Sequence, residues 1–296
     1  MSIIWIKARM AAFTLTGVLH IVGLCLISKI KICQCNQRLL IINLAAIEMV
    51  GSWYSVLTDA VVIGRKWNMY WEQTHIFFVF TLYTVIRLAV LNIIMDRFLD
   101  IFLNLKYPLY ITKKFISGVL TAQWITMISA AILFTLLVKF DIYPLHDFYY
   151  FLTYFHLSLD ILITLVAMVT YTYFFFRVRS IMSTHTQGVS RNKQMLWKNF
   201  KVPLLMIASY ILFNVTATVM KVVALQRLIS RNYHFDELFV LLTGLSGILD
   251  TLGWISDGLI YIFLQKKIRG ILTSKLGKSI RAQNSVVSEI SLSTKT

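Results

Sequence analysis

The stretch that decides the fold is QTHIFFVFTLYTVIRLAVLNIIM, residues Gln73–Met95. A helix that crosses the ~30 Å hydrocarbon core of a bilayer needs ~20 predominantly apolar residues, and this stretch supplies them. Its one charged residue is Arg87. The stretch is therefore predicted to be a transmembrane helix, and a guanidinium at that depth needs a partner.

Working outward, six other segments are long and apolar enough to span a bilayer. The segment nearest the start follows Lys7 and Arg9, as a signal peptide would. Its apolar run exceeds the ~7–15 residues of a signal-peptide core, so we expect a retained helix. The six segments are Met10–Ser28, Leu39–Ile63, Phe115–Val138, Phe148–Phe176, Val202–Met220 and Leu238–Leu264. The sequence thus predicts an all-α membrane protein, with one seven-transmembrane helix bundle over residues 10–264.

Composition excludes several other classes of protein. Only 14% of the 296 residues are charged and 58% are apolar, whereas soluble domains carry ~25% charged residues. That balance argues against a soluble fold, a disordered chain and a nucleic-acid-binding protein. The sequence contains no phosphate-binding loop, nucleophile elbow or zinc-protease motif, so we expect no enzyme.

The basic residues predict the orientation of the helices. The chain has 29 Lys and Arg against 13 Asp and Glu, a net charge of +16. Twenty of the 29 fall on one side of the predicted bundle, which marks that side as cytoplasmic. The regions that hold them are Lys29–Arg38, Arg97–Lys114, Arg177–Lys201 and the chain from Lys266 onward. We therefore expect a plasma-membrane protein with residues 1–9 as a short extracellular N-terminus and a cytoplasmic C-terminus.

Four motifs in this topology resemble those of one family. Met95–Ile101 (MDRFLDI) and Leu105–Leu109 (LKYPL) resemble the D/E-R-Y and P-L-x-Y stretch of rhodopsin-like (class A) G-protein-coupled receptors. Asn43–Glu48 (NLAAIE) resembles N-L-A-x-x-D of their second helix, and Asp257–Tyr261 (DGLIY) resembles N/D-P-x-x-Y of their seventh. Trp124 stands at the spacing of the fourth-helix tryptophan. The chain is thus similar to a divergent member of this family.

The resemblance implies the roles of the cytoplasmic residues. Asp96, Arg97 and Phe98 would form a switch in which Arg97 is held by Asp96 or released into a cytoplasmic cleft; the alternative is a helix-end arginine that reaches the interface. Tyr261, with Tyr171 or Tyr173, would hold the open state. Residues 265–274 would form a short amphipathic eighth helix, and 275–296 a disordered cytoplasmic tail.

Two groups of ionisable residues are predicted within the membrane. By the resemblance, Glu48 and Asp257 face each other and could hold a sodium ion, with a shared proton as the alternative. We also predict an ion pair between Arg87 and Asp160, with a wet cavity or Glu48 as the alternative partner of Arg87.

The outer half of the bundle is the expected ligand site, because a concave, largely apolar cavity with few polar groups suits a small molecule. Val79 stands where amine receptors carry an aspartate, which argues against a monoamine bound in that way. Lys221 and Asp59 lie near predicted helix ends, where solvation is the alternative. The candidate pocket residues are Val79, Phe80, Tyr83, Thr84, His156, Lys221 and Asp250.

Several positions depart from the family pattern. The third-helix cysteine aligns with Glu72, so the usual outer disulfide cannot form, and Asn214 stands where the sixth helix carries C-W-x-P. We expect a receptor for an unknown extracellular ligand, with a heterotrimeric G protein, arrestin at the Ser/Thr-rich tail and anionic membrane lipid as partners. The alternatives are a small transporter or ion pathway that uses the intramembrane charges, and a non-signalling membrane protein on a receptor scaffold.

Overall fold

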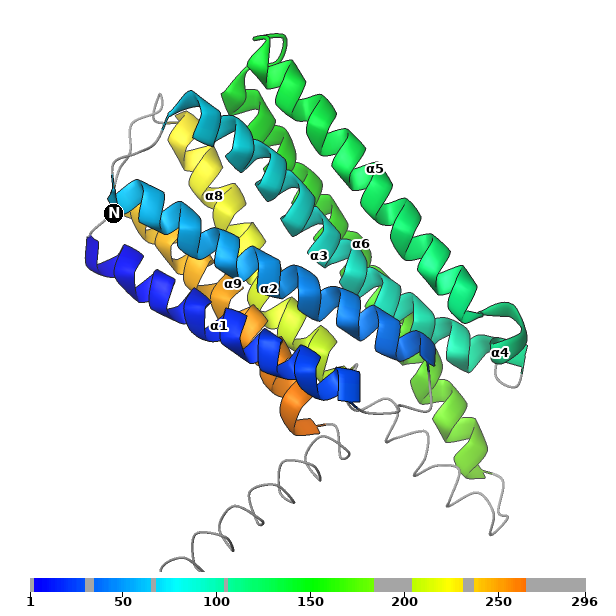
Figure 1. The fold of residues 1–296 in the computed structure, drawn as a ribbon. Coiled ribbons are helices and arrows are strands. Elements are labelled where there is room, and N and C mark those ends of the chain that lie inside the picture. Colours follow the sequence, from blue (N-terminus) through cyan, green and yellow to red (C-terminus); the bar gives the residue numbers. More distant parts are fainter. Residues whose placement is uncertain are drawn as a thin grey trace, which may run out of the picture.

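The computed structural model describes residues 3–29, 35–64, 68–103, 106–183, 204–230 and 237–264. Nearly all of these residues are helical (Figure 1). Seven helices in this part of the chain are long and apolar enough to cross a membrane, which confirms the predicted multi-pass helical architecture. Six of them are α1 (Ile3–Lys29), α2 (Cys35–Ile63), α3 (Met69–Leu103), α5 (Lys113–Lys139), α6 (Leu145–Ser183) and α9 (Glu237–Leu264).

The sixth span, Leu204–Ser230, is irregular at its middle. It consists of helical residues 204–210, the π-helical turn η2 (Ile211–Val215) and α8 (Thr216–Ser230). A π turn widens the helix by one residue and often occurs at functional sites. Here it includes Asn214, the residue that replaces the motif expected at this level of the sixth helix.

Helix α3 is the centre of the bundle. It packs against α2, α5 and α6, and α1 packs against both α2 and α9, so the first and last spans lie side by side (Figure 1). The short helix α4 (Tyr107–Tyr110) follows α3 at its C-terminal end. Helix α5 lies at the edge of the bundle, and the indole nitrogen of Trp124 on it donates to Asn43 of α2 over 3.0 Å.

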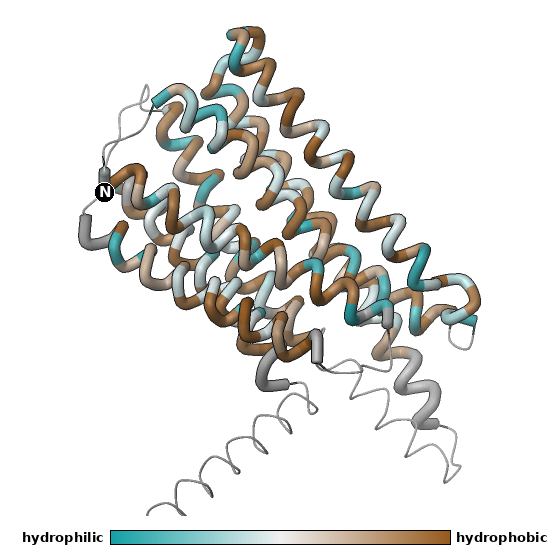
Figure 2. Tube along the Cα trace, in the orientation of Figure 1, coloured by the Kyte–Doolittle hydropathy of each residue, from teal (hydrophilic) through white to brown (hydrophobic). Residues whose placement is uncertain are grey.

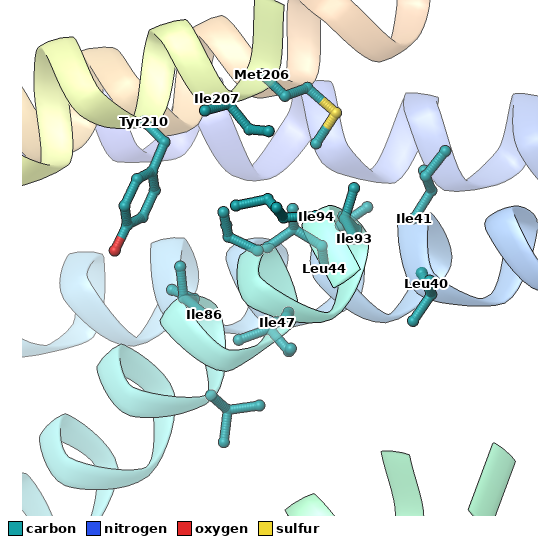
Figure 3. Packing of buried hydrophobic residues seen from close by; sticks show 14 of the residues in the cluster. Leu40, Ile41, Leu44, Ile47, Ile86, Ile93, Ile94, Met206, Ile207 and Tyr210 are labelled. Carbon is teal, nitrogen blue, oxygen red and sulfur yellow. The ribbon is translucent and has the colours of Figure 1, made fainter. Parts of the chain in front are cut away.

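Apolar side chains fill the inner half of the bundle. Figure 3 shows Leu44 and Ile47 of α2, Ile93 of α3, and Met206 and Ile207 of the sixth span in one packed layer. Figure 2 shows that hydrophobic positions run along most of each helix, interrupted by single hydrophilic ones. Those isolated polar positions on otherwise apolar helices are the ones that build the site.

The helices extend past the apolar runs that predicted them. Helix α1 begins at Ile3 rather than Met10, and α3 continues to Leu103 rather than ending at Met95. Residues 3–9, expected as a tail outside the first helix, are therefore helical. The predicted eighth helix (265–274) and tail (275–296) lie outside the described residues.

A close approach fixes the sixth span against the seventh. A Cβ added at Gly253 of α9 would lie 2.8 Å from the amide nitrogen of Asn214 and 3.2 Å from the Cβ of Phe213. Only a residue without a side chain fits at this distance. Gly253 therefore sets how near α9 lies to the π turn.

Candidate functional site

Arg97 is held by two carboxylates near the C-terminal end of α3. Its guanidinium donates to Asp96, with Nε 3.2 Å from Oδ2, and to Asp100, with Nη1 3.3 Å from Oδ2. The side chain of Arg97 is only 2% exposed. The Asp96–Arg97 pair is thus present as predicted, and Asp100 adds a second acceptor.

The short helix α4 holds the other side of this lock. The Tyr107 hydroxyl donates to Asp96, and Asn36 of α2 donates to the Ile111 carbonyl over 2.6 Å. Burial, together with the hydrogen bond to Asp96, raises the pKa of the Tyr107 hydroxyl above its ordinary value, so it stays a donor. Asp96 is therefore shared between Arg97 and Tyr107, which links α3 to α4.

The aromatic residues around the lock face different ways. Tyr171 of α6 packs against the core close to Arg97. The rings of Phe98 and Tyr173 lie 6.0 Å apart, and Tyr173 is about one-third exposed. Tyr171 rather than Tyr173 is therefore the tyrosine near Arg97; the side chain of Tyr261 lies outside the described residues.

Arg87 and Asp160 form a bidentate ion pair in the middle of the bundle. Arg87 Nε lies 3.0 Å from Oδ1, and Nη2 lies 3.2 Å from Oδ2. Nη2 also donates to Thr218 over 2.8 Å, and the Tyr210 hydroxyl donates to Asp160. The predicted pair is confirmed, and it joins α3 and α6 to both halves of the sixth span around the π turn.

Glu48 and Asp257 form a buried acidic pair between α2 and α9, as expected. Both carboxyl oxygens of Glu48, Oδ1 of Asp257 and the hydroxyl of Ser209 are buried without a hydrogen-bond partner among the described residues. His20 Nε2 lies 3.4 Å from Glu48 Oε2 and donates to the Trp254 carbonyl over 3.2 Å. Two carboxylates this close in a low dielectric need a shared proton or a cation.

These oxygens are of the kind that binds hard metal ions. Hard cations take oxygen ligands, and Glu48, Asp257 and Ser209 supply buried, unpartnered ones. Within the described ranges, no group of three or more His, Cys, Asp or Glu side chains is placed to hold a metal ion. The oxygen donors of Glu48, Asp257 and Ser209 are of the kind that suits a hard cation better than a soft-ligand transition metal.

The outer half of the bundle contains a cavity of about 110 Å³ between α1, α2, α3 and α9. Tyr83, Val79 and Asp250 line it, together with Arg9 and Asp59. Arg9 Nε donates to Asp59 Oδ2 over 3.0 Å. This cavity is small, polar on several sides and bordered by charges of both signs.

A second ion pair borders the cavity. Lys221 of α8 donates to Asp250 of α9, and its ammonium lies 5.2 Å from the centre of the Tyr83 ring. An ammonium over an aromatic face gains a cation–π interaction. Tyr83 in turn lies next to Trp254, with ring centroids 5.8 Å apart. Tyr83 thus contacts both Lys221 at the edge of the cavity and Trp254, whose carbonyl accepts from His20.

Three of the predicted pocket residues lie elsewhere. Thr84 and His156 are hydrogen-bonded to each other over 3.1 Å and are buried between α3 and α6. Phe80 packs in a separate apolar cluster, with its ring 5.1 Å from that of Phe134. None of the three lines the outer cavity.

Sequence reasoning missed the Arg9–Asp59 pair. Arg9 was placed before the first helix, and solvation was the alternative for Asp59, yet Asp59 is 1% exposed. The available signal was Asp59 itself, because a carboxylate inside an apolar span needs a partner. Helix α1 extends beyond its apolar run, and this extension puts Arg9 level with Asp59.

The chain matches no protein-family model and no curated protein.

Proposed function

We propose that the chain is a divergent rhodopsin-like G-protein-coupled receptor of the plasma membrane. A ligand in the outer cavity shifts the population from an inward-closed to an inward-open state, and the open state exposes Arg97 to a heterotrimeric G protein. The N-terminus is extracellular, and the cytoplasmic tail recruits arrestin after phosphorylation. Support comes from the order and spacing of the four motifs together with seven membrane-spanning helices.

The observation that carries this proposal is the lock at Arg97. A guanidinium buried at the inner end of a helix between two carboxylates bears a desolvation cost that an exposed arginine would avoid. Asp96 also accepts a hydrogen bond from Tyr107, so this carboxylate couples Arg97 to α4. A charged group with alternative partners suits a bistable element.

A continuous set of contacts joins the outer cavity to the sixth span. Tyr83 lines the cavity, and its backbone carbonyl accepts from Arg87 Nη1 over 3.0 Å. Arg87 reaches Thr218 of α8 and, through Asp160, Tyr210 before the π turn. A ligand that displaces Tyr83 therefore bears directly on the helix whose outward movement would open the cytoplasmic cleft.

A nucleotide-exchange assay with a panel of purified G proteins tests this proposal. The Arg97→Ala variant is expected to lose exchange, and Asp96→Asn to raise ligand-free exchange because it weakens the lock. Lys113→Ala is the matched control, since Lys113 is an exposed basic residue at the same end of the bundle. Equal exchange by wild type and Arg97→Ala in a coupled system would contradict the proposal.

A second candidate is a sodium- or proton-coupled ion pathway, and one observation favours it. No Lys or Arg of the described residues pairs with the buried Glu48–Asp257 pair, which has only His20 beside it, whereas Arg87–Asp160 and Lys221–Asp250 are satisfied ion pairs. Intramembrane carboxylates of this kind occur in ion and proton routes. Sodium-driven or proton-driven uptake in vesicles that is lost in Glu48→Gln would establish this function.

A further inference from the structure

A second cavity adjoins the polar one. It measures about 140 Å³ and lies between α1 and α9. Its lining is small or apolar apart from Arg9 and Thr251, and it includes Ala12, Gly244 and Ile255. Arg9 also lines the outer polar cavity, so one guanidinium forms the wall between an apolar groove and a polar pocket.

The groove is partly open and can take part of a single hydrocarbon chain, with the rest of that chain in the bilayer. From Gly244 to Ile255 the helix rises about 17 Å at 1.5 Å per residue, close to the depth of one leaflet of a ~30 Å hydrocarbon core. Leu252 on its rim is exposed on the outside of the bundle. At Gly244 nothing lies within 4 Å of an added Cβ, so the space beside it is open.

Arg9 can donate a hydrogen bond to a ligand while it keeps its hydrogen bonds to Asp59. Its Nε and Nη2 donate to Asp59, whereas Nη1 lies 3.6 Å from the position of a Cβ on Gly247 of α9. In the part of the chain that the structure describes, no residue accepts a hydrogen bond from Nη1. A donor is therefore available where the groove meets the polar cavity.

The charges beside the groove are already balanced. Arg9 is paired with Asp59, and Lys221 with Asp250, so the site is neutral as a whole. A charged head group would leave an uncompensated charge at membrane depth. A neutral head with both donors and acceptors would instead find Nη1 of Arg9, Thr58 and Ser55 around the cavity.

We infer that the ligand is a neutral single-chain amphiphile, with its acyl chain in the α1–α9 groove and a hydroxyl or amide head at Arg9 in the polar cavity. The ligand reaches the pocket sideways from the outer leaflet. This inference names the ligand class of the receptor proposed above, so the signalling effect of the ligand rests on that proposed function. Its binding needs no G protein, and the two failures are therefore distinguishable.

The test is saturation binding of tritiated monooleoylglycerol to the full chain in phosphatidylcholine nanodiscs. Wild type is expected to bind one equivalent saturably. Gly244→Phe places a ring at a position where an added Cβ meets open space, and it is expected to weaken binding at least about tenfold, because the ring takes up apolar contact area in the groove. Gly118→Phe on α5 is the matched control, since its Cβ also meets open space but on an exposed face far from Arg9.

Competitors on the wild type test the head group without any substitution. Unlabelled monooleoylglycerol should displace the tracer, whereas oleate and 1-octadecene should each compete at least about tenfold more weakly. Non-saturable binding, binding by Gly244→Phe equal to wild type, or an equal loss in Gly118→Phe would each overturn the groove assignment. Equal competition by oleate or 1-octadecene would overturn the neutral polar head. Binding that behaves as expected without G-protein coupling would leave the ligand class standing and remove the receptor function.

Discussion

At the residue scale, the chain places each intramembrane charge next to a counterpart or a second acid. Arg87 meets Asp160, Arg9 meets Asp59, Lys221 meets Asp250 and Glu48 meets Asp257. The Arg87 pair could be predicted from the sequence, because a mid-span arginine demands a carboxylate and the alignment put Asp160 near it. The Arg9 pair could not, since the apolar run alone gave no reason to extend the first helix to Arg9.

Replacing only one residue of the Arg87–Asp160 pair should destabilise the protein far more than replacing both. Arg87→Leu leaves Asp160 buried without its cation, at a cost of about 3–5 kcal/mol, so surface expression and thermal stability should fall sharply. Replacing both residues, Arg87→Leu with Asp160→Leu, removes the uncompensated charge and should restore much of both. Cell-surface labelling and thermal unfolding of the purified chain measure the two effects. Without any recovery in the double variant, the pair would not act as a unit.

Neutralising one acid of the Glu48–Asp257 pair should stabilise the protein when sodium is absent. Glu48→Gln removes like-charge repulsion between two buried carboxyl groups, and its Tm in sodium-free buffer should rise by a few degrees. Sodium is expected to raise the Tm of the wild type, and this rise should disappear in the variant. Ser52→Ala is the control, because the Ser52 hydroxyl only donates to the Glu48 backbone carbonyl. A sodium effect that survives Glu48→Gln would exclude this pair as the cation site.

At the element scale, the length of the apolar runs predicted the seven spans. It did not predict the amphipathic ends of the helices, which extend beyond those runs. Helix α3 continues to Leu103 through Asp96, Arg97 and Asp100, whose charges end an apolar run without ending a helix. Helix α4 and the π turn were not predicted, because four helical residues and one extra residue per turn leave no periodicity to detect. The absence of the C-W-x-P sequence from the sixth span therefore did not predict the π turn η2 at that position.

The spacing between the sixth and seventh spans should depend on Gly253. In Gly253→Ala the new methyl group would lie 2.8 Å from the Asn214 amide, so the π turn or α9 must shift. Overpacking of this kind costs about 1–3 kcal/mol and should lower the Tm. Gly244→Ala on the same helix meets nothing within 4 Å and should leave the Tm within a degree or two of wild type. If both variants unfold alike, the close approach does not constrain the bundle.

At the scale of the whole molecule, the distribution of Lys and Arg predicted which side of the membrane each end of the bundle faces. The order of the predicted spans then placed each motif at one end or the other. The sequence showed which end would carry Arg97 and which would carry the pocket. It did not show that Phe80, Thr84 and His156 lie outside the cavity, because that depends on the rotation of α3 and α6 about their axes. Rotation is set by packing against several neighbours and has no local sequence code.

The orientation can be measured directly. His146 lies in the first turn of α6, next to the α5–α6 connection, and Lys106 directly precedes α4 at the opposite end of the bundle; both are exposed. In intact cells a membrane-impermeant maleimide should label His146→Cys but should label Lys106→Cys only after permeabilisation. The wild type, with Cys25, Cys33 and Cys35, gives the background. The reverse pattern would invert the topology and place the outer cavity in the cytoplasm.

Trp254 connects the two halves of the molecule, with consequences for spectroscopy. Its indole lies against Phe13 and Tyr83 and over Gly51, while its carbonyl accepts from His20 beside Glu48. A change in the outer cavity would move the ring, and a change in the acidic pair would alter the electric field at its backbone. The emission of this nearly inaccessible indole, one of seven in the chain, should shift in wavelength with either event. The protein therefore carries its own fluorophore at the junction, and ligand and cation titrations can be followed optically without a label.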